Sequence, residues 1–416
     1  MLASAAMRDA QRMGLPASSI TPLGSLRRFA PAVGDVSLLA VAPAAAHAEV
    51  LTGFARLPAV AAILARSLSH ITIGNERGVI TLRVTIPEEA GSALVWHTGS
   101  LGHTSQLQER AQRMGFAFDS GRLIDNRGQG VPTGTEADFY KRLELPEIPP
   151  ELREGEDEIG AAERSALPVL VSTADIRGDL HMHSTWSDGR DSIDQMVFAA
   201  QQLGYEYVAI TDHSERSTAS RQLAAADISR QRADIEKVRT RAKRVHVLHG
   251  IEVDIMPDGS LDFDDDQLAG FDIVLASLHD HAGHDSATLT ERYLRAIRHP
   301  LVNVITHPTN RTPGRSSGYR LDFDALFAAA AETGTALEVD GAPGHLDLDG
   351  TLARRAVAAG AMLVIDSDCH RSDGLGRQMR FGVGTARRGW IEPAHVLNTR
   401  GLDEVRAFIA RKRARA

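Results

Sequence analysis

Three side chains in one short segment could together hold a metal ion. The segment GDLHMHSTWSDG, residues 178–189, carries His181, His183 and Asp188. The run from Asp175 to Leu180 before them has the character of a short strand. Side chains at positions i and i+2 of a strand point to the same side, so both imidazoles would face one cavity at its end. A lone pair of this kind is more often a surface feature, so the metal interpretation depends on partners elsewhere in the chain.

The second half of the chain contains elements that could position such partners. Apolar runs of β type alternate there with amphipathic helical stretches, which predicts parallel strands joined by helical crossovers. Seven strands are too many for a small open sheet and indicate a barrel related to the (β/α)8 type. The predicted strands cover residues 176–181, 206–211, 246–251, 272–278, 301–306, 335–339 and 361–366, and the predicted helices cover residues 192–204, 224–243, 286–299, 321–334 and 352–360.

Each predicted strand ends in a residue type that binds metals. In barrels of this kind the active site lies at the carboxyl ends of the strands, so these side chains are expected to meet. Imidazoles mixed with carboxylates, without a thiolate cluster, suit Zn, Mn or Fe. Several such metals can polarise a phosphoryl oxygen and lower the pKa of water towards ~7, which predicts phosphoester hydrolysis. The strand ends carry His181, His183, Asp212, His213, Glu252, Asp254, His279, His307, Glu338, Asp340, Asp366, Asp368 and His370.

These motifs resemble the PHP superfamily, named for polymerase and histidinol phosphatase. The matching motifs are GDLHMHSTWSDG, AITDHS, GIEVDIMPDGSLD, ASLH, ITHPTNRTPGR and DSDCH. The resemblance implies a distorted (β/α)7 barrel with two or three divalent ions (Zn²⁺, Mn²⁺ or Fe²⁺). It also implies that His183, Glu252 and Asp368 surround a metal-bound water at the catalytic centre. The implied ligands are His181, His183, Glu252 and Asp368 for the first metal, Glu252, His279 and His307 for the second, and Asp188, His213 and His370 for the third.

Other residues near these motifs have supporting roles. We expect Arg311 and Arg315 to contact substrate phosphate, because guanidinium groups bind phosphate in a bidentate manner. The alternative is that one or both pair with the acidic loop 263–266. Asp212 and Asp254 are expected either to support the ligands by hydrogen bonds or to stabilise the fold.

The first half of the chain resembles a different domain. The segment GSLRRFAPAVGDVSLLAV, residues 24–41, is similar to the nucleotidyltransferase palm of bacterial family X DNA polymerases, and the likeness continues through residues 78–100 and 140–159. It implies a small α+β palm/thumb-like domain in front of the barrel. We therefore predict a degenerate palm/thumb-like domain over residues 1–145, a linker over 146–175 and a PHP domain over 176–416.

The palm differs from the polymerase pattern at two of three metal-binding positions. Asp35 keeps the first carboxylate, but Ser37 and Thr81 stand at the second and third. Neutral hydroxyls remove most of the charge that binds Mg²⁺. We therefore predict that polymerase activity is lost. The alternative is that another carboxylate such as Glu76 substitutes.

The bulk composition limits where the protein works. The chain has 416 residues, a net charge of −8 and one cysteine, Cys369. A single cysteine excludes an internal disulfide and suits a reducing compartment. No apolar stretch approaches the ~20 residues of a membrane span, and the N-terminus lacks the apolar core of a signal peptide. These features predict a cytoplasmic protein without a membrane partner.

The leading functional prediction is a metal-dependent phosphoesterase that acts on DNA, as a 3′→5′ exonuclease or a 3′-end-processing repair enzyme. Its partner would be DNA with a 3′ end or a small phosphoester, and the sequence does not identify a protein partner. The first alternative is a phosphatase for a small phosphomonoester such as histidinol phosphate. The second is a DNA-end-binding module without catalysis, which the complete ligand set argues against. Retained polymerase activity is the least favoured.

Overall fold

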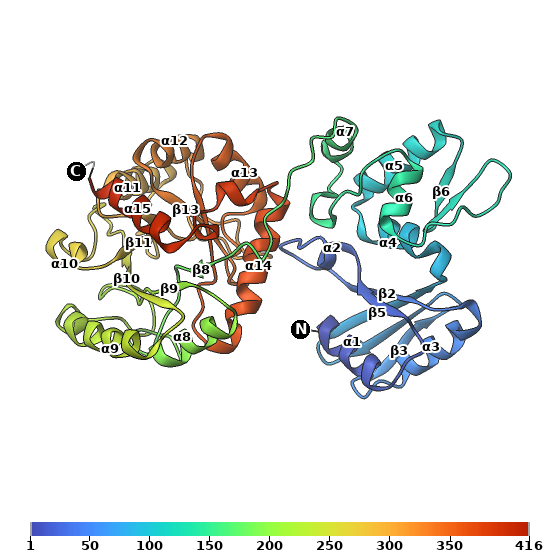
Figure 1. The fold of residues 1–416 in the computed structure, drawn as a ribbon, viewed down its shortest axis with the longest axis horizontal. Coiled ribbons are helices and arrows are strands. Elements are labelled where there is room, and N and C mark those ends of the chain that lie inside the picture. The colour runs from blue at the N-terminus through green and yellow to red at the C-terminus, as the bar shows by residue number, and fades with distance from the viewer. Residues whose placement is uncertain (1, 415–416) are drawn as a thin grey trace. The chain divides into compact units, whose positions relative to one another are not determined.

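The computed structural model describes residues 2–414, which divide into two compact units (Figure 1). The first unit ends at Leu167 and the second begins at Pro168. This division falls inside the segment 146–175 that the sequence indicated as a linker. Each unit has its own apolar core, and each is described separately below.

The segment 146–175 contributes to both units. In the first unit, the guanidinium of Arg153 is completely buried and its Nη1 lies 2.6 Å from Oε1 of Glu136. Val171 belongs to the apolar core of the second unit. Long-range contacts of this kind are not visible in local sequence composition, which explains why the segment had the appearance of a linker.

The first unit begins with a five-stranded sheet in the order β1-β2-β5-β4-β3. Strands β2 and β5 are parallel, and the other neighbouring pairs are antiparallel. Apolar side chains of two helices, α1 and α3, pack with those of the sheet in one core. The elements are α1 (Leu2–Arg12), β1 (Ser19–Pro22), α2 (Gly24–Arg27), β2 (Val36–Val41), α3 (His47–Ala55), β3 (Ala62–Arg66), β4 (His70–Asn75) and β5 (Gly78–Thr85).

A helical region with a short hairpin completes the first unit. Buried aromatic rings hold it together, with the centroids of Phe118 and Phe139 4.5 Å apart. Thr135 caps α6 by accepting a hydrogen bond from the Asp138 amide, which fixes the start of that helix at Glu136. The elements are α4 (Ala90–Thr98), α5 (Leu101–Arg113), β6 (Ala117–Asp119), β7 (Arg122–Ile124), α6 (Glu136–Arg142) and α7 (Glu158–Glu163).

The second unit is a seven-stranded parallel sheet that curls into a nearly closed barrel, as the sequence predicted. Its strands follow chain order from β8 to β14, and every neighbouring pair is parallel. A bridge between Met182 and Cys369 brings the first and last strands together. The strands are β8 (Gly178–Asp179), β9 (Tyr207–Ile210), β10 (His246–Asp254), β11 (Ile273–Ser277), β12 (Val304–Ile305), β13 (Ala336–Asp340) and β14 (Leu363–Asp366).

Helices surround the barrel, and one packs against its inward-facing residues. The five helices predicted between strands are present, whereas α10, α14 and α15 had no counterpart in the sequence interpretation. Leu402, Val405 and Phe408 of α15 share a core with the inward-facing apolar residues of the strands. No helix within residues 2–414 is long and apolar enough to cross a membrane. The helices are α8 (Ile193–Gln202), α9 (Ile228–Arg241), α10 (Asp265–Ala269), α11 (Ser286–Arg298), α12 (Phe323–Thr333), α13 (Gly350–Ala358), α14 (Leu375–Arg388) and α15 (Leu402–Arg413).

The inward face of the strands changes from apolar to ionisable along their length. Because side chains alternate along a strand, Leu248 and Glu252 of β10 point to the same side, with Gly250 between them. On β13, Ala336 belongs to the inner apolar core. Glu338 and Asp340 follow it at every second position and therefore lie on the same face of the strand. The amino-terminal half of the barrel interior is therefore packed with apolar groups, and the carboxyl end carries the chemistry.

Candidate metal centre

The structure brings the nine predicted ligands together at the carboxyl ends of the strands. Three of these ligands, His181, His183 and Glu252, are completely buried, and the remainder are buried or partly buried. They come from strands and loops that are far apart in the chain. His181, His183 and Asp188 follow β8, His213 follows β9, Glu252 lies in β10, His279 follows β11, His307 follows β12, and Asp368 and His370 follow β14.

Glu252 lies between two sets of imidazoles. Its Oε2 lies 2.7 Å from Nδ1 of His213 and 3.5 Å from Nε2 of His181. Its Oε1 lies 3.0 Å from Nε2 of His307 and 3.8 Å from Nε2 of His279. A carboxylate with one oxygen towards each set has the geometry needed to bridge two metal positions.

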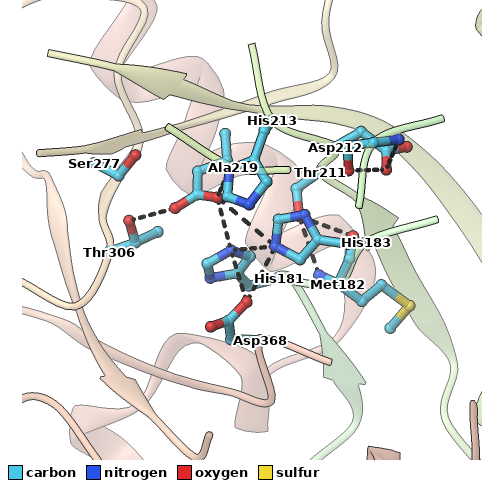
Figure 2. Close-up of polar contacts among 12 residues, drawn as sticks. His181, Met182, His183, Thr211, Asp212, His213, Ala219, Ser277, Thr306 and Asp368 are labelled. Carbon is cyan, nitrogen blue, oxygen red and sulfur yellow. Dashed lines mark hydrogen bonds and ion pairs between the residues drawn. The ribbon is translucent and has the colours of Figure 1, made fainter. Parts of the chain in front are cut away.

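Three side chains define one of these positions (Figure 2). The Nε2 atoms of His181 and His183 lie 3.1 Å apart, and Nε2 of His183 lies 3.0 Å from Oδ1 of Asp368. Figure 2 shows the two imidazoles and this carboxylate converging on one point. The ligand atoms of these three residues all lie within 4.8 Å of one another, which is close enough to coordinate a single ion.

A second group lies on the other side of His183. The ring of His183 stacks on that of His213 and on that of His370, with centroid distances of 4.3 and 4.2 Å, and the centroids of His213 and His370 are 6.1 Å apart. Oδ1 of Asp188 lies 3.2 Å from Nε2 of His370 and 3.6 Å from Nε2 of His213. These four side chains also offer ligand atoms within 4.8 Å of one another.

The donor set fits bound cations. Among the described residues, Asp188 Oδ1 and Glu252 Oε2 are buried carboxylate oxygens that accept no hydrogen bond. The Nε2 atoms of His181 and His183 face each other, and at least one of them has no proton when both rings are neutral. Buried acceptors that converge without donors between them are costly unless a cation binds there.

His183 and Glu252 have the protonation states of metal ligands, whereas the surrounding carboxylates outweigh burial and raise the pKa of His181, His213, His307 and His370, a charge that bound cations would replace. Burial, together with the neighbouring His370 and His213, lowers the pKa of His183 to about 3, so its imidazole is neutral at pH 7. Neutral imidazole is the form that binds metals. Burial by itself raises the pKa of Glu252, but the neighbouring His213 and His181 outweigh that effect and hold the pKa well below its usual range.

Two of the candidate ligands have backbone conformations that L-residues rarely adopt. His307 has a φ of 26° and Asp368 a φ of 47°. Such residues persist only where the surrounding structure holds them, and they occur often at functional sites. Both lie two residues after the end of a strand, where the backbone turns and the side chain joins the cluster.

Three further carboxylates support the candidate ligands. Glu338, which sequence reasoning noted at a strand end but did not assign, accepts a hydrogen bond from Nδ1 of His181 (2.7 Å). Asp254 lies 3.0 Å from Nδ1 of His279. Asp212 accepts hydrogen bonds from Ser184, Ser187 and Gln231 and so stabilises the loop after β8. The strand-end pattern was the only sequence signal for Glu338.

The two predicted phosphate-binding arginines differ in their surroundings. Nε of Arg311 donates to the carbonyl oxygen of His345 (3.1 Å), and its Nη1 pairs with Asp349 (3.1 Å). Nη2 of Arg311 is buried and donates no hydrogen bond within the described residues. Arg315 is exposed. Neither guanidinium pairs with loop 263–266 in the part of the chain that the structure describes, and the role of both towards phosphate stays a prediction.

Cys369 lies between two candidate ligands but points away from them. Its side chain is buried, and its Sγ lies 2.9 Å from the carbonyl oxygen of Arg371 and 2.7 Å from Oε1 of Gln378, so its single proton can be donated to either. Burial raises the pKa of this thiol to about 12. Because the sulfur faces the Arg371 carbonyl and Gln378 and belongs to none of the ligand groups among the described residues, Cys369 is not among the candidate ligands.

The palm-like sheet of the first unit places the three predicted polymerase positions side by side. Ser37 of β2 is the register partner of Thr81 of β5, and the hydroxyl of Ser37 donates to Oδ2 of Asp35 (2.8 Å). The hydroxyl of Thr81 lies 3.0 Å from that of Thr72. Glu76 lies in the turn between β4 and β5, where it lines a pocket with residues of α1.

Comparison with known proteins assigns families to both units. Residues 179–339 match the PHP domain, and residues 93–154 match the DNA polymerase beta thumb. The DNA polymerase/3'-5' exonuclease PolX of Bacillus subtilis (strain 168) is 36% identical over 398 residues, which is 93% of this chain and 68% of that protein. A probable phosphatase of Shewanella oneidensis is 32% identical over 208 residues, 48% of this chain and 78% of the phosphatase. Another, from Thermoanaerobacter sp. (strain X514), is 26% identical over 247 residues, 56% of this chain and 95% of the phosphatase.

Proposed function

Because this chain belongs to the PolX family of DNA polymerases with a PHP domain, we propose that its barrel removes nucleotides from the 3′ end of DNA. The PHP domain makes the chain a hydrolase of phosphoester bonds. The observation that carries the more specific proposal is the complete set of nine ligand-type side chains, Glu252 among them, in a chain that also contains a polymerase-type thumb region.

The proposed chemistry divides between bound ions and the residues of the chain. Two or three divalent ions, when bound, supply Lewis acidity and activate water for attack on phosphorus. Glu252 would hold two of these ions, and Asp368 and His183 would hold one of them together with it. We propose that Nη2 of Arg311, which has no hydrogen-bond partner among the described residues while Nε and Nη1 are held by the loop after β13, donates to a phosphate oxygen of the substrate.

The extent of the similarity favours DNA over a small ester. The Bacillus relative, whose name includes a 3'-5' exonuclease, aligns with 93% of this chain, whereas the probable phosphatases align with 48% and 56%. A phosphatase for small esters would need only the barrel. The thumb-type region therefore supports a polymeric substrate, and the phosphatase remains the alternative.

We also propose that the first unit no longer polymerises DNA. Ser37 and Thr81 are register partners at the centre of the palm-like sheet, and both are neutral hydroxyls. Asp35 alone gives too little charge there to hold two Mg²⁺ ions in the manner of a polymerase. Glu76 lines a pocket with α1 residues, which supports a different role for that carboxylate.

The direct test is hydrolysis by the full chain reloaded with Mn²⁺ or Zn²⁺. The substrates are a 5′-labelled single strand, a duplex with a recessed 3′ end, and histidinol phosphate. A His183→Ala variant removes one candidate ligand. A His246→Ala variant is the matched control, because His246 lies exposed at the opposite end of β10 from Glu252.

We expect the wild type and His246→Ala to produce a ladder of shortened strands, and His183→Ala to produce none. Phosphate release from histidinol phosphate with the DNA left intact would instead establish the phosphatase. DNA that is retained on a filter without any cleavage, at every metal tested, would overturn both and leave a binding module.

A further inference from the structure

A third group of ligand-type side chains lies beside the nine predicted ones. Asp340, His345 and Asp368 offer one atom each, and these atoms all lie within 4.8 Å of one another. Asp340 ends β13, and His345 lies in the loop that follows it. Of the three, only Asp368 is among the predicted ligands, so the group extends the cluster in a direction that the resemblance to PHP domains did not indicate.

The carboxylate of Asp340 needs a positive partner. It is completely buried, and its Oδ1 accepts a hydrogen bond from the amide of Ala342 (2.5 Å). Its Oδ2 has no hydrogen-bond partner, and no lysine or arginine pairs with it within residues 2–414. Two other buried carboxylates, Glu338 and Asp368, add negative charge next to it. In such surroundings the charged form of the carboxylate is strongly disfavoured unless a cation binds beside it.

His345 presents an imidazole to the same place. Its ring stacks on that of His307, with centroids 4.9 Å apart and planes inclined by 22°. Its Nδ1 is buried and has no hydrogen-bond partner among the described residues. Its backbone is held at both polar groups, since the amide donates to Ala342 (2.9 Å) and the carbonyl accepts from Arg311 (3.1 Å). The loop is therefore fixed, while its imidazole makes no bond at Nδ1.

We propose that Asp340, His345 and Asp368 hold an additional divalent ion beside the metal cluster. This inference rests on the proposed metal-dependent function, because Asp368 would be shared between the new position and the one formed with His181 and His183. One imidazole with two carboxylates suits Zn²⁺ or Mn²⁺. Three protein ligands leave open positions, so the ion could also bind a phosphate oxygen of the substrate.

The test is the number of metal ions per chain. Each protein is stripped with a chelator, reloaded with Zn²⁺ or Mn²⁺, dialysed and analysed by elemental mass spectrometry. The proteins compared are the wild type, His345→Ala, Asp340→Asn, His183→Ala and the control His246→Ala. Asp340→Asn keeps the oxygen that accepts from Ala342 and removes the charge. Circular dichroism shows whether each variant is folded.

His345→Ala and Asp340→Asn are each expected to bind one ion fewer than the wild type and His246→Ala. Equal numbers in the wild type and these two variants, with His183→Ala still losing metal, would overturn the additional position and leave the proposed function standing. A wild type that binds no metal at all would overturn both.

Discussion

Oε1 of Glu338 lies 2.7 Å from Nδ1 of His181, and its other oxygen accepts a hydrogen bond from the backbone amide of His307 (2.7 Å). One buried carboxylate thus holds two candidate ligands that come from different strands. A hydrogen bond at Nδ1 fixes the tautomer of His181 and leaves Nε2 for the cluster.

Replacing Glu338 by glutamine should weaken metal binding without removing a ligand. Partners that orient ligating histidines are worth about 10–100-fold in metal affinity. We expect a decrease of that size for Zn²⁺ in Glu338→Gln, measured by competition with a chromogenic chelator. Glu291→Gln, on the exposed face of α11, is the control. An affinity equal to that of the wild type would mean that Glu338 stabilises only the fold.

Removal of metal should destabilise the barrel unit in particular. Glu252, Glu338, Asp340 and Asp368 are all buried within the same end of the barrel, and their mutual repulsion increases when no cation is present. A ligand at ~1,000 times its Kd adds about 4 kcal/mol to the stability of the folded state. We therefore expect EDTA to lower the Tm of one calorimetric transition by about 10 °C, and added Zn²⁺ or Mn²⁺ to restore it. A scan that EDTA leaves unchanged would contradict a metal site in these residues.

Sequence reasoning reached the barrel and its cluster because both depend on a local pattern. Parallel strands end at one edge of a barrel, so a ligand-type residue after each strand, such as His213 or His307, predicts a common site. The alternation that puts Leu248 and Glu252 on one side of β10 follows from strand geometry alone.

The remaining features depend on contacts between distant residues. His345 stands five positions after a strand, in a loop whose path is set partly by the hydrogen bond from Arg311, and no local pattern indicates that its ring reaches His307. Arg311 itself pairs with Asp349 rather than with loop 263–266. The packing of residues 146–167 with the first unit depends in the same way on the pair between Arg153 and Glu136.

The buried carboxylate of Glu136 should make the first unit sensitive to acid. Burial raises its pKa, but Arg153 and Arg27 outweigh that effect and leave the pKa below its usual value of 4.5. A carboxylate whose pKa is lower in the folded state stabilises that state at all pH values above 4.5. This stabilisation of the folded state is lost as the pH falls below 4.5 and through the lower pKa that Glu136 has in the folded protein.

Glu136→Gln removes this charge and leaves Arg153 buried without its carboxylate partner, which costs about 3 kcal/mol or more. We expect the Tm of one calorimetric transition to fall at pH 7 and to change less than that of the wild type between pH 6 and pH 3. Glu88→Gln, on a partly exposed turn of the same unit, provides the comparison. A variant that matches the wild type at pH 7 would show that the arginines are satisfied in another way.

The pairing of Ser37 with Thr81 predicts how the palm can regain a metal site. Adjacent parallel strands lie ~4.8 Å apart, so carboxylates at both positions would meet beside Asp35. In a His183→Ala background, a Ser37→Asp, Thr81→Asp double variant should bind Mn²⁺ through the first unit, measured by electron paramagnetic resonance. The double asparagine variant has the same shape without the charge and should bind no more Mn²⁺ than the His183→Ala parent. Primer extension by the wild type with Mg²⁺ and deoxynucleotides would contradict the premise that the hydroxyls abolish polymerisation.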